Sequence, residues 1–461
     1  MENVDDISTP SCEYKEMELH RDLPGDLLGG SMRMRTAAQK WLPMEERETP
    51  LQYSGRLMRS YLYPGFKLGT EFISAKPFVK PITIKNLDGE KLNMILTDAD
   101  YSGTSLTQFA KSIFQDGVRW GIAFFLVEYP TVPMNINLAE EREMGVHPYF
   151  SRIDPRNLIK VCSALTAGGR RRIRYIRYRE YVEDDVCSIV EMTAPENGQL
   201  GEVIRYEFNE SKKEWVESSR KSHTFPGVPL VPFYTNRTGF MCGLPPLSDL
   251  AETNLIHWQS MSDQRNILRF ARLPILFQSG VTSEDLEKPL ELGPLTIVRA
   301  KNPDAKLMVV EHTGKAIEAG QKDLDSLETK MDALAMEPFV RRTQKTATGV
   351  VSDDAKSMSM VEMWVRDLEI CLTTGFRYAS IYAKEPLRED FGIDVYSEFS
   401  LAMRANDDIK VLQADRARGD LTHKTYLQES KRRGFLSDDV DIDQEVESSG
   451  LPTEGSGNGF D

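Results

Sequence analysis

The sequence MCGLPPLSDLAETNLIHWQSMSDQRNILRFARLP, from Met241 to Pro274, predicts one long helix. The helix would begin after Gly-Leu-Pro-Pro and stop at a proline, because proline cannot continue a helix. Trp258 and Met261 are apolar, yet Asn254 and His257 lie among the same positions. A helix on one side of a core would instead carry an apolar stripe and a solvated face. The mixed pattern therefore predicts contacts on several sides, as in a ring of identical subunits.

Hydrophobic periodicity predicts further elements on both sides of this helix. Residues 1–25 are polar and contain Pro10 and Pro24, so they predict an irregular arm. The other predicted elements are helical tendency over 26–63, a helix over 106–118, a buried strand over 120–127, an antiparallel meander with strands over 172–182, 186–192, 202–208 and 214–216, helices over 316–340 and 358–384, and two helical segments within 405–450.

The segment between the two long helices at 247–273 and 316–340 reads as a small β insert. Its predicted strands are Leu295–Arg299 and Leu307–Val310, with Asn302-Pro303-Asp304 as the turn. Two short strands bury too little surface for a core of their own. The insert therefore needs neighbours, which adjacent subunits could supply.

Composition fits a globular protein of two to four domains, since the chain has 461 residues, 40% of them hydrophobic. The formal net charge of −14 suits neither wrapping nor strong binding of nucleic acid, because an acidic surface repels phosphate. Five cysteines without C-x-x-C spacing argue against a disulfide framework or zinc ribbon and favour a reducing compartment. No secretory leader is expected, and no apolar run reaches the roughly 20 residues that a membrane span needs.

Several pieces of the chain, taken in order, resemble one family. They are LLGGSMRMRTAAQKWLP (27–43), YSGRLMRSYLYPGF (53–66), KPFVKP (76–81), DGVRWGIAFFLVEYP (116–130), PYFSRIDPRNLIK (148–160) and VPLVPFYTNRTGFMCGLPPLSDLAETNL (228–255), followed by the 241–274 helix. Their order and spacing resemble the portal proteins of tailed bacteriophages, in a branch catalogued only as a domain of unknown function.

The resemblance implies an α+β portal-like fold with a β-rich wing, long stem helices, a small α/β clip and a helical crown. Its parts, carried over by position, are an N-terminal arm (1–25), a wing with a helical start and antiparallel strands (26–246), two stem helices (247–273 and 316–340), a clip (274–315), a tunnel loop (341–354), a long helix returning to the wing (355–399), a crown (400–450) and a flexible tail (451–461).

The resemblance also implies a function without catalysis. A ring of twelve copies would sit at the unique vertex of a tailed-phage capsid, and double-stranded DNA would pass through it during packaging and ejection. Implied partners are the terminase large subunit, a head-tail adaptor, and the major capsid and scaffolding proteins, with no membrane and no cofactor. The implied location is the virion, and the host cytoplasm during assembly.

Two groups of site residues follow from this reading. Arg341, Arg342, Thr343, Gln344 and Lys345 would face DNA from the tunnel loop. Arg341 and Arg342 could equally cap the end of the preceding helix, where cations favour the dipole, so Lys345 is the better candidate. The second group would make contacts between the stems of neighbouring subunits, and comprises Asn254, Trp258, Met261 and Arg265.

Other readings stay open. The run GGRRRIRYIRYREY, Gly168 to Tyr181, interleaves cations with aromatics, so Arg170–Arg179 could bind single-stranded nucleic acid. The plainer reading pairs these cations with nearby acids such as Glu183, Asp184, Asp185 and Glu202. A phage nuclease or processing hydrolase would need clustered carboxylates, and no H-E-x-x-H, G-x-S-x-G or phosphate-loop motif is present. The acids at 353–354 and 438–443 lack calcium-loop spacing, so no metal site is expected.

Overall fold

The computed structural model describes residues 6–130, 144–166, 168–181, 187–196, 198–272, 275–279, 304, 306–310, 314–339, 358–397, 405–419, 421–432, 436 and 440–448. The chain divides into two compact units. Unit 1 contains Met1–Arg21, Thr70–Pro246 and Met336–Asp461, and unit 2 contains Asp22–Gly69 and Leu247–Ala335. Helices and antiparallel sheets are both present, which confirms the predicted mixed fold class.

The centre of unit 1 is a three-stranded antiparallel sheet in the order β3-β2-β9. Its strands are β2 (Ile122–Glu128), β3 (Tyr149–Ile153) and β9 (Leu230–Tyr234). Every β2 side chain from Ile122 to Val127 is fully buried, so the predicted buried strand is confirmed. Gly121 precedes β2 with φ 82°, and a Cβ there would collide with the Leu244 backbone, so this close approach requires glycine.

Two helices pack against this sheet. α6 (Leu106–Trp120) contacts β2, and α11 (Met360–Ala383) contacts both β9 and β2. Each begins with a capping box, in which Ser105 or Ser359 accepts the backbone N–H three residues later. Both helices confirm the sequence prediction. Strands β1 (Thr83–Lys85) and β14 (Gly392–Asp394) form a short antiparallel ladder, and β14 contacts α11. Helix α5 (Glu90–Thr97) contacts α6 and α11.

The second sheet of unit 1 is a five-stranded antiparallel meander in chain order, of which the last four strands were predicted. Its strands are β4 (Leu158–Leu165), β5 (Arg171–Tyr181), β6 (Cys187–Thr193), β7 (Gly201–Asn209) and β8 (Glu214–His223). β8 extends seven residues past the predicted end at Val216, because its whole length pairs with β7. The small ladder of β10 (Arg237–Gly239) with β11 (Cys242–Gly243) follows.

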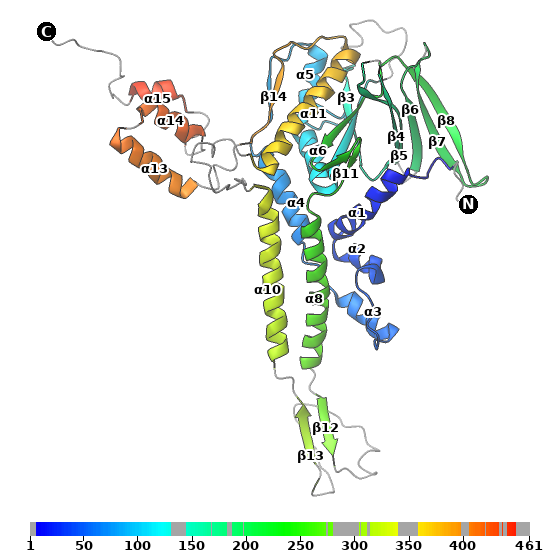
Figure 1. Ribbon diagram of the computed structural model, residues 1–461, viewed down its shortest axis with the longest axis vertical. Coiled ribbons are helices and arrows are strands. Elements are labelled where there is room, and N and C mark those ends of the chain that lie inside the picture. Colours follow the sequence, from blue (N-terminus) through cyan, green and yellow to red (C-terminus); the bar gives the residue numbers. More distant parts are fainter. Residues whose placement is uncertain are drawn as a thin grey trace, which may run out of the picture. The chain divides into compact units, whose positions relative to one another are not determined.

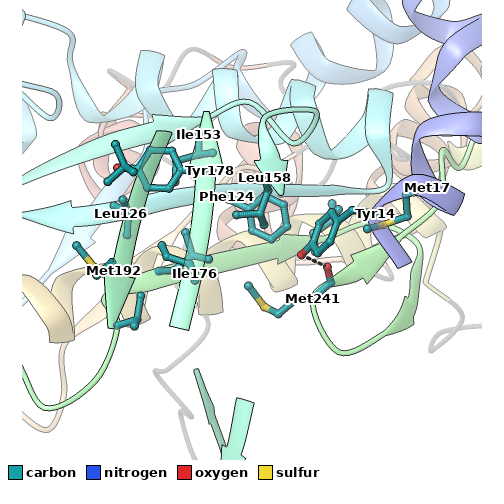
Figure 2. Close-up of a cluster of buried hydrophobic side chains, with 14 residues drawn as sticks. Tyr14, Met17, Phe124, Leu126, Ile153, Leu158, Ile176, Tyr178, Met192 and Met241 are labelled. Carbon is teal, nitrogen blue, oxygen red and sulfur yellow. Dashed lines mark hydrogen bonds between the residues drawn. The ribbon is translucent and has the colours of Figure 1, made fainter. Parts of the chain in front are cut away.

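The prediction of an irregular N-terminal arm is wrong, because helix α1 spans Cys12–Leu28 and contains Pro24. Figure 2 shows Tyr14 and Met17 of α1 in one apolar cluster with side chains of both sheets, among them Phe124 and Tyr178. The Tyr14 hydroxyl donates a hydrogen bond of 3.1 Å to the carbonyl of Met241. Tertiary packing therefore fixes a segment whose local sequence is polar.

Unit 2 is built from helices and one ribbon of two strands (Figure 1). Its elements are α2 (Gly30–Ala37), the 3-10 turn η1 (Ala38–Lys40), α3 (Pro50–Arg59), α8 (Ser248–Arg272), β12 (Ile275–Ser279), β13 (Lys306–Val310) and α10 (Lys315–Met336). α8 and α10 match the two predicted long helices. The helix α4 (Gly65–Ala75) belongs partly to each unit, and the turns η2 (Lys76–Phe78) and η4 (Glu337–Phe339) lie in unit 1.

The ribbon contains one strand that the sequence analysis did not predict. β13 confirms the strand at Leu307–Val310, but its partner is β12, in register from Ile275↔Val310 to Ser279↔Lys306. The other predicted strand, Leu295–Arg299, lies outside the described residues. Near the C-terminus the structure has three helices instead of two, α13 (Ala405–Arg418), α14 (His423–Arg432) and α15 (Ile442–Ser448).

Candidate functional site

The α8–α10 helix pair is the part of unit 2 that the sequence marked as unusual. Nε2 of His257 lies 3.2 Å from Oε1 of Glu328, and Nε2 of Gln264 donates to the carbonyl of Ile317 at 2.8 Å. Because residue numbers rise along α8 while their partners' numbers fall along α10, the two helices are antiparallel. They lie side by side in Figure 1.

The polar residues of α8 are explained by specific partners inside one chain. Asn254 is fully buried, and its side chain accepts from the backbone N–H of Phe66 at 2.9 Å and donates to the carbonyl of Tyr63 at 2.8 Å. Gln259 donates to the carbonyl of Trp41 at 2.7 Å. Buried backbone groups need such partners, so these amides fasten residues 41–66 to the helix.

His257 lies against α10 with its ring 5.2 Å from that of Tyr63. Burial lowers the pKa of His257, and the neighbouring Glu328 opposes that shift. Gly320 of α10 faces the Gln264 side chain, and a Cβ at this position would collide with it. The contact between α8 and α10 is therefore polar at His257 and Gln264. The two helices approach each other closely at Gly320, which has no side chain.

The helix α3 is joined to the same unit by an arginine. Arg56 is 4% exposed, donates twice to the Glu48 carboxylate at 2.9 and 2.8 Å, and donates to the carbonyl of Pro43 at 2.9 Å. Its guanidinium also lies 3.7 Å from Asp263 of α8. Bidentate arginine–carboxylate pairs are strong and directional, so Glu48 raises the pKa of Arg56 and fixes its orientation.

The four residues predicted to join neighbouring stems have different environments in the chain. Asn254 and Trp258 are both 0% exposed, so no surface of either is left for a second copy. Met261 is half-buried, and Arg265 is exposed with its guanidinium 5.7 Å from the Tyr61 ring centroid. A single chain thus accounts for Asn254 and Trp258, while a contact between copies through Met261 and Arg265 stays a prediction.

The predicted DNA-facing residues Arg341, Arg342, Thr343, Gln344 and Lys345 lie outside the described residues. Among the described ones, no group of three or more His, Cys, Asp or Glu side chains is arranged to hold a metal ion. None of the described helices combines the length and apolar composition of a bilayer-spanning segment. The five cysteines are free thiols.

The arginine-rich strand β5 has its cations engaged by neighbours. Arg177 pairs with Glu191 at 2.7 Å, and Arg174 pairs with Glu196 at 2.5 Å. Arg179 donates to the carbonyl of Ser8 at 3.0 Å. These partners favour the plainer reading of the strand, although the acids differ from those that sequence proximity suggested. A hollow of about 850 Å³ beside Arg174 and Arg177 also contains Glu196 and Glu202, so its charge is mixed.

Sequence reasoning missed a second group of arginines, on α2, α3 and α8. Arg35, Arg59, Arg265 and Arg269 line one hollow of about 660 Å³ together with Met58, Tyr61 and Leu268. The sequence contained one indication of this group, because Arg265 and Arg269 are four residues apart on the long helix. Arg59 joins them through the packing of α3 on α8, and Arg35 lines the same hollow from α2.

Comparisons with known proteins give three results. A family model described as a domain of unknown function (DUF4055) matches residues 246–383, less than a third of the chain, which agrees with the resemblance to an uncharacterised branch. No curated protein matches. Solved structures with a similar trace include the virion of a native gene transfer agent particle, at 11% identity and a TM-score of 0.42, covering 87% of this chain and 98% of that one.

Two further structures are similar at the same level. One is the neck of an empty gene transfer agent particle computed with C6 symmetry, at 11% identity and a TM-score of 0.40, covering 81% of this chain and 90% of that one. The other is the neck of the native particle computed with C12 symmetry, at 11% identity and a TM-score of 0.41, covering 85% and 90%.

Proposed function

We propose that this protein is a portal: a ring of about twelve copies at one vertex of a tailed-phage capsid, with a central channel for double-stranded DNA. The observation that carries the proposal is the construction of unit 2. Two antiparallel helices of 25 and 22 residues are joined through the β12–β13 ribbon, and α10 buries only Leu324 and Met331 within its own chain. A helix so little covered needs further neighbours.

The sequence resemblance supports the same conclusion, because the helix pair corresponds to the stem and the ribbon to the clip. The ribbon would dock the terminase large subunit during packaging and a head-tail adaptor afterwards. Segment 341–354 would narrow the channel, with Lys345 nearest to passing phosphates. The chain would work in the virion, without catalysis or a cofactor, after assembling with capsid and scaffolding proteins in the host cytoplasm.

Charge supports a channel more than a binding groove. Twelve copies would carry a formal charge of about −170, twelve times the −14 of one chain, so the ring cannot assemble through net attraction. An acidic wall also holds DNA weakly, which suits a duplex that has to slide. Assembly would therefore depend on local packing and on local pairing of opposite charges.

The decisive measurement is the native mass of the purified chain, together with negative-stain images. The proposal predicts closed rings with a central hole, of about twelve subunits of 52.4 kDa each. A stable monomer across micromolar concentrations and salt conditions contradicts it. DNA cleavage that depends on a divalent metal would favour a nuclease, and tight salt-dependent binding of short oligonucleotides by a monomer would favour a nucleic-acid-binding protein.

A second measurement tests the ribbon. Replacing residues 276–312 with a short Gly-Ser linker leaves both long helices in place, so rings should still form. Particles made with this variant should lack adaptor and tails. Tail-bearing, DNA-filled particles would show that docking does not use the ribbon.

A further inference from the structure

The arginine hollow of unit 2 is basic in an otherwise acidic chain. Arg35, Arg59, Arg265 and Arg269 line it, and no carboxylate is among its lining residues. Arg35 donates to the carbonyl of Ser60 at 3.1 Å, and Arg265 lies over the ring of Tyr61. Within the part of the chain that the structure describes, none of these four guanidinium groups forms an ion pair.

Of the acids nearest to the hollow, one is already bound by another arginine. A neighbouring hollow of about 450 Å³ shares Arg59 and Arg269 and contains Glu45, Glu48 and Asp263. Glu48 is held by both of its bonds to Arg56. The two hollows together are lined by five arginines and three acids, so positive charge remains unbalanced within the chain and is available to a partner.

The lining is also apolar at the surface. Met58 is 65% exposed and Tyr61 is 48% exposed, both large side chains beside the arginines. Phosphate groups of a duplex would leave these side chains in water. A protein surface with carboxylates around an apolar residue would cover both kinds of side chain, as interface cores usually do.

The same helix α8 carries acidic and apolar side chains on another of its faces. Glu252, Ile256 and Asp263 are exposed, Ile256 by 48% and the Asp263 side chain by 60%. At about 100° per residue, these three lie roughly 140° around the helix from Arg265 and Arg269. One helix thus has a basic face with exposed apolar neighbours and an acidic face centred on an isoleucine.

We propose that the basic hollow (Arg35, Arg59, Arg265 and Arg269) of one copy receives the acidic face of α8 (Glu252, Ile256 and Asp263) of the next copy. This inference rests on the proposed function. Two different, complementary patches on separate faces of one helix make a head-to-tail contact, and repetition of such a contact closes into a ring. The arginines would bind carboxylates, while Ile256 would pack on Met58 and Tyr61.

Charge reversal with mixing tests the proposal. The basic-face variant is Arg265→Glu/Arg269→Glu, and the acid-face variant is Glu252→Arg/Asp263→Arg. Arg265, Arg269 and Glu252 are exposed, so circular dichroism and unfolding midpoints should stay near wild type. Asp263 also lies 3.7 Å from the Arg56 guanidinium, so Glu252→Arg alone is measured beside the double variant as the control for loss of that contact. Each variant alone brings like charges together at every contact and should need a roughly tenfold or higher concentration to form rings. An equimolar mixture should regain assembly, because alternating copies restore opposite charges.

The outcomes separate the two claims. If both variants form rings at the same concentration as wild type, the contact proposed for the basic hollow is overturned and the portal proposal stands. Failure of the mixture, when both variants are folded, overturns it as well. If the basic-face variant forms normal rings but loses affinity for a 20-base-pair duplex in fluorescence anisotropy, the arginines bind phosphate and the contact between copies is rejected. Wild type that stays monomeric rejects the portal proposal and this inference with it.

Discussion

The two units of the chain bury their interiors in different ways. In unit 1, β2 is surrounded by aromatic and aliphatic side chains from α6, α11 and neighbouring strands. In unit 2, Asn254, Gln259 and Gln264 of α8 donate hydrogen bonds to backbone carbonyls that are distant in the sequence. Apolar packing is tolerant of position, whereas an amide bonded to a backbone group fixes a single arrangement. Apolar packing therefore stabilises the interior of unit 1. In unit 2, hydrogen bonds fix the geometry and parts of the helix surface stay exposed.

The largest effect that would test this contrast is a cavity in unit 1. Phe125 is 0% exposed, with the rings of Phe109 and Phe150 at 5.6 and 5.0 Å. Phe125→Ala should lower the free energy of unfolding by about 3–5 kcal/mol, measured by urea denaturation. The matched control is Phe208→Ala on β7, which is 46% exposed and should cost far less. Equal losses at both positions would mean that the sheet is not the stabilising core.

A smaller loss is expected in unit 2 from a single amide. Asn254→Ala leaves the N–H of Phe66 and the carbonyl of Tyr63 unpaired inside the protein, which should cost about 1–3 kcal/mol in the same measurement. Asn266, half-buried on the same helix, provides the control as Asn266→Ala. If Asn254→Leu is as stable as wild type, apolar packing would also suffice in unit 2, and the contrast between the units fails.

The smallest effect concerns pH. Burial lowers the pKa of His257, so the folded chain holds this ring neutral at a pH where the unfolded chain, with a usual pKa near 6.5, takes up a proton. Its contribution is fully present above about pH 7 and is lost as the pH falls below 6.5. The unfolding free energy should therefore drop between pH 7.5 and 5.5 by up to about 1 kcal/mol more in wild type than in His257→Gln. An equal drop in both would show that Glu328 cancels the effect of burial.

Periodicity alone was enough to predict elements that have a strong local pattern. The uninterrupted apolar run of β2, the meander strands β5, β6 and β7, and the helices α6, α8, α10 and α11 were all expected near their observed ends. In each, the residues that form the element also carry its burial pattern, with a repeat of two or 3.6 residues. The resemblance to an uncharacterised branch likewise rested on sequence, and a family model matches residues 246–383.

Elements and contacts that depend on distant partners could not be predicted in this way. α1 contains Pro24 and a polar sequence, yet the packing of Tyr14 and Met17 in the unit 1 core holds it as a helix. The partner of β13 is β12, across an intervening segment of the chain. Asn254 was expected to contact another copy, but it bonds backbone groups 188 and 191 residues away in its own chain.

Local sequence therefore determined the helices and strands that have a strong apolar pattern, because that pattern is a property of neighbours along the chain. Only the tertiary structure decided where the polar residues of α8 point, and that four arginines from three helices share one hollow. Hydrogen bonds and charge clusters join residues without regard to their separation in sequence, so no periodicity records them.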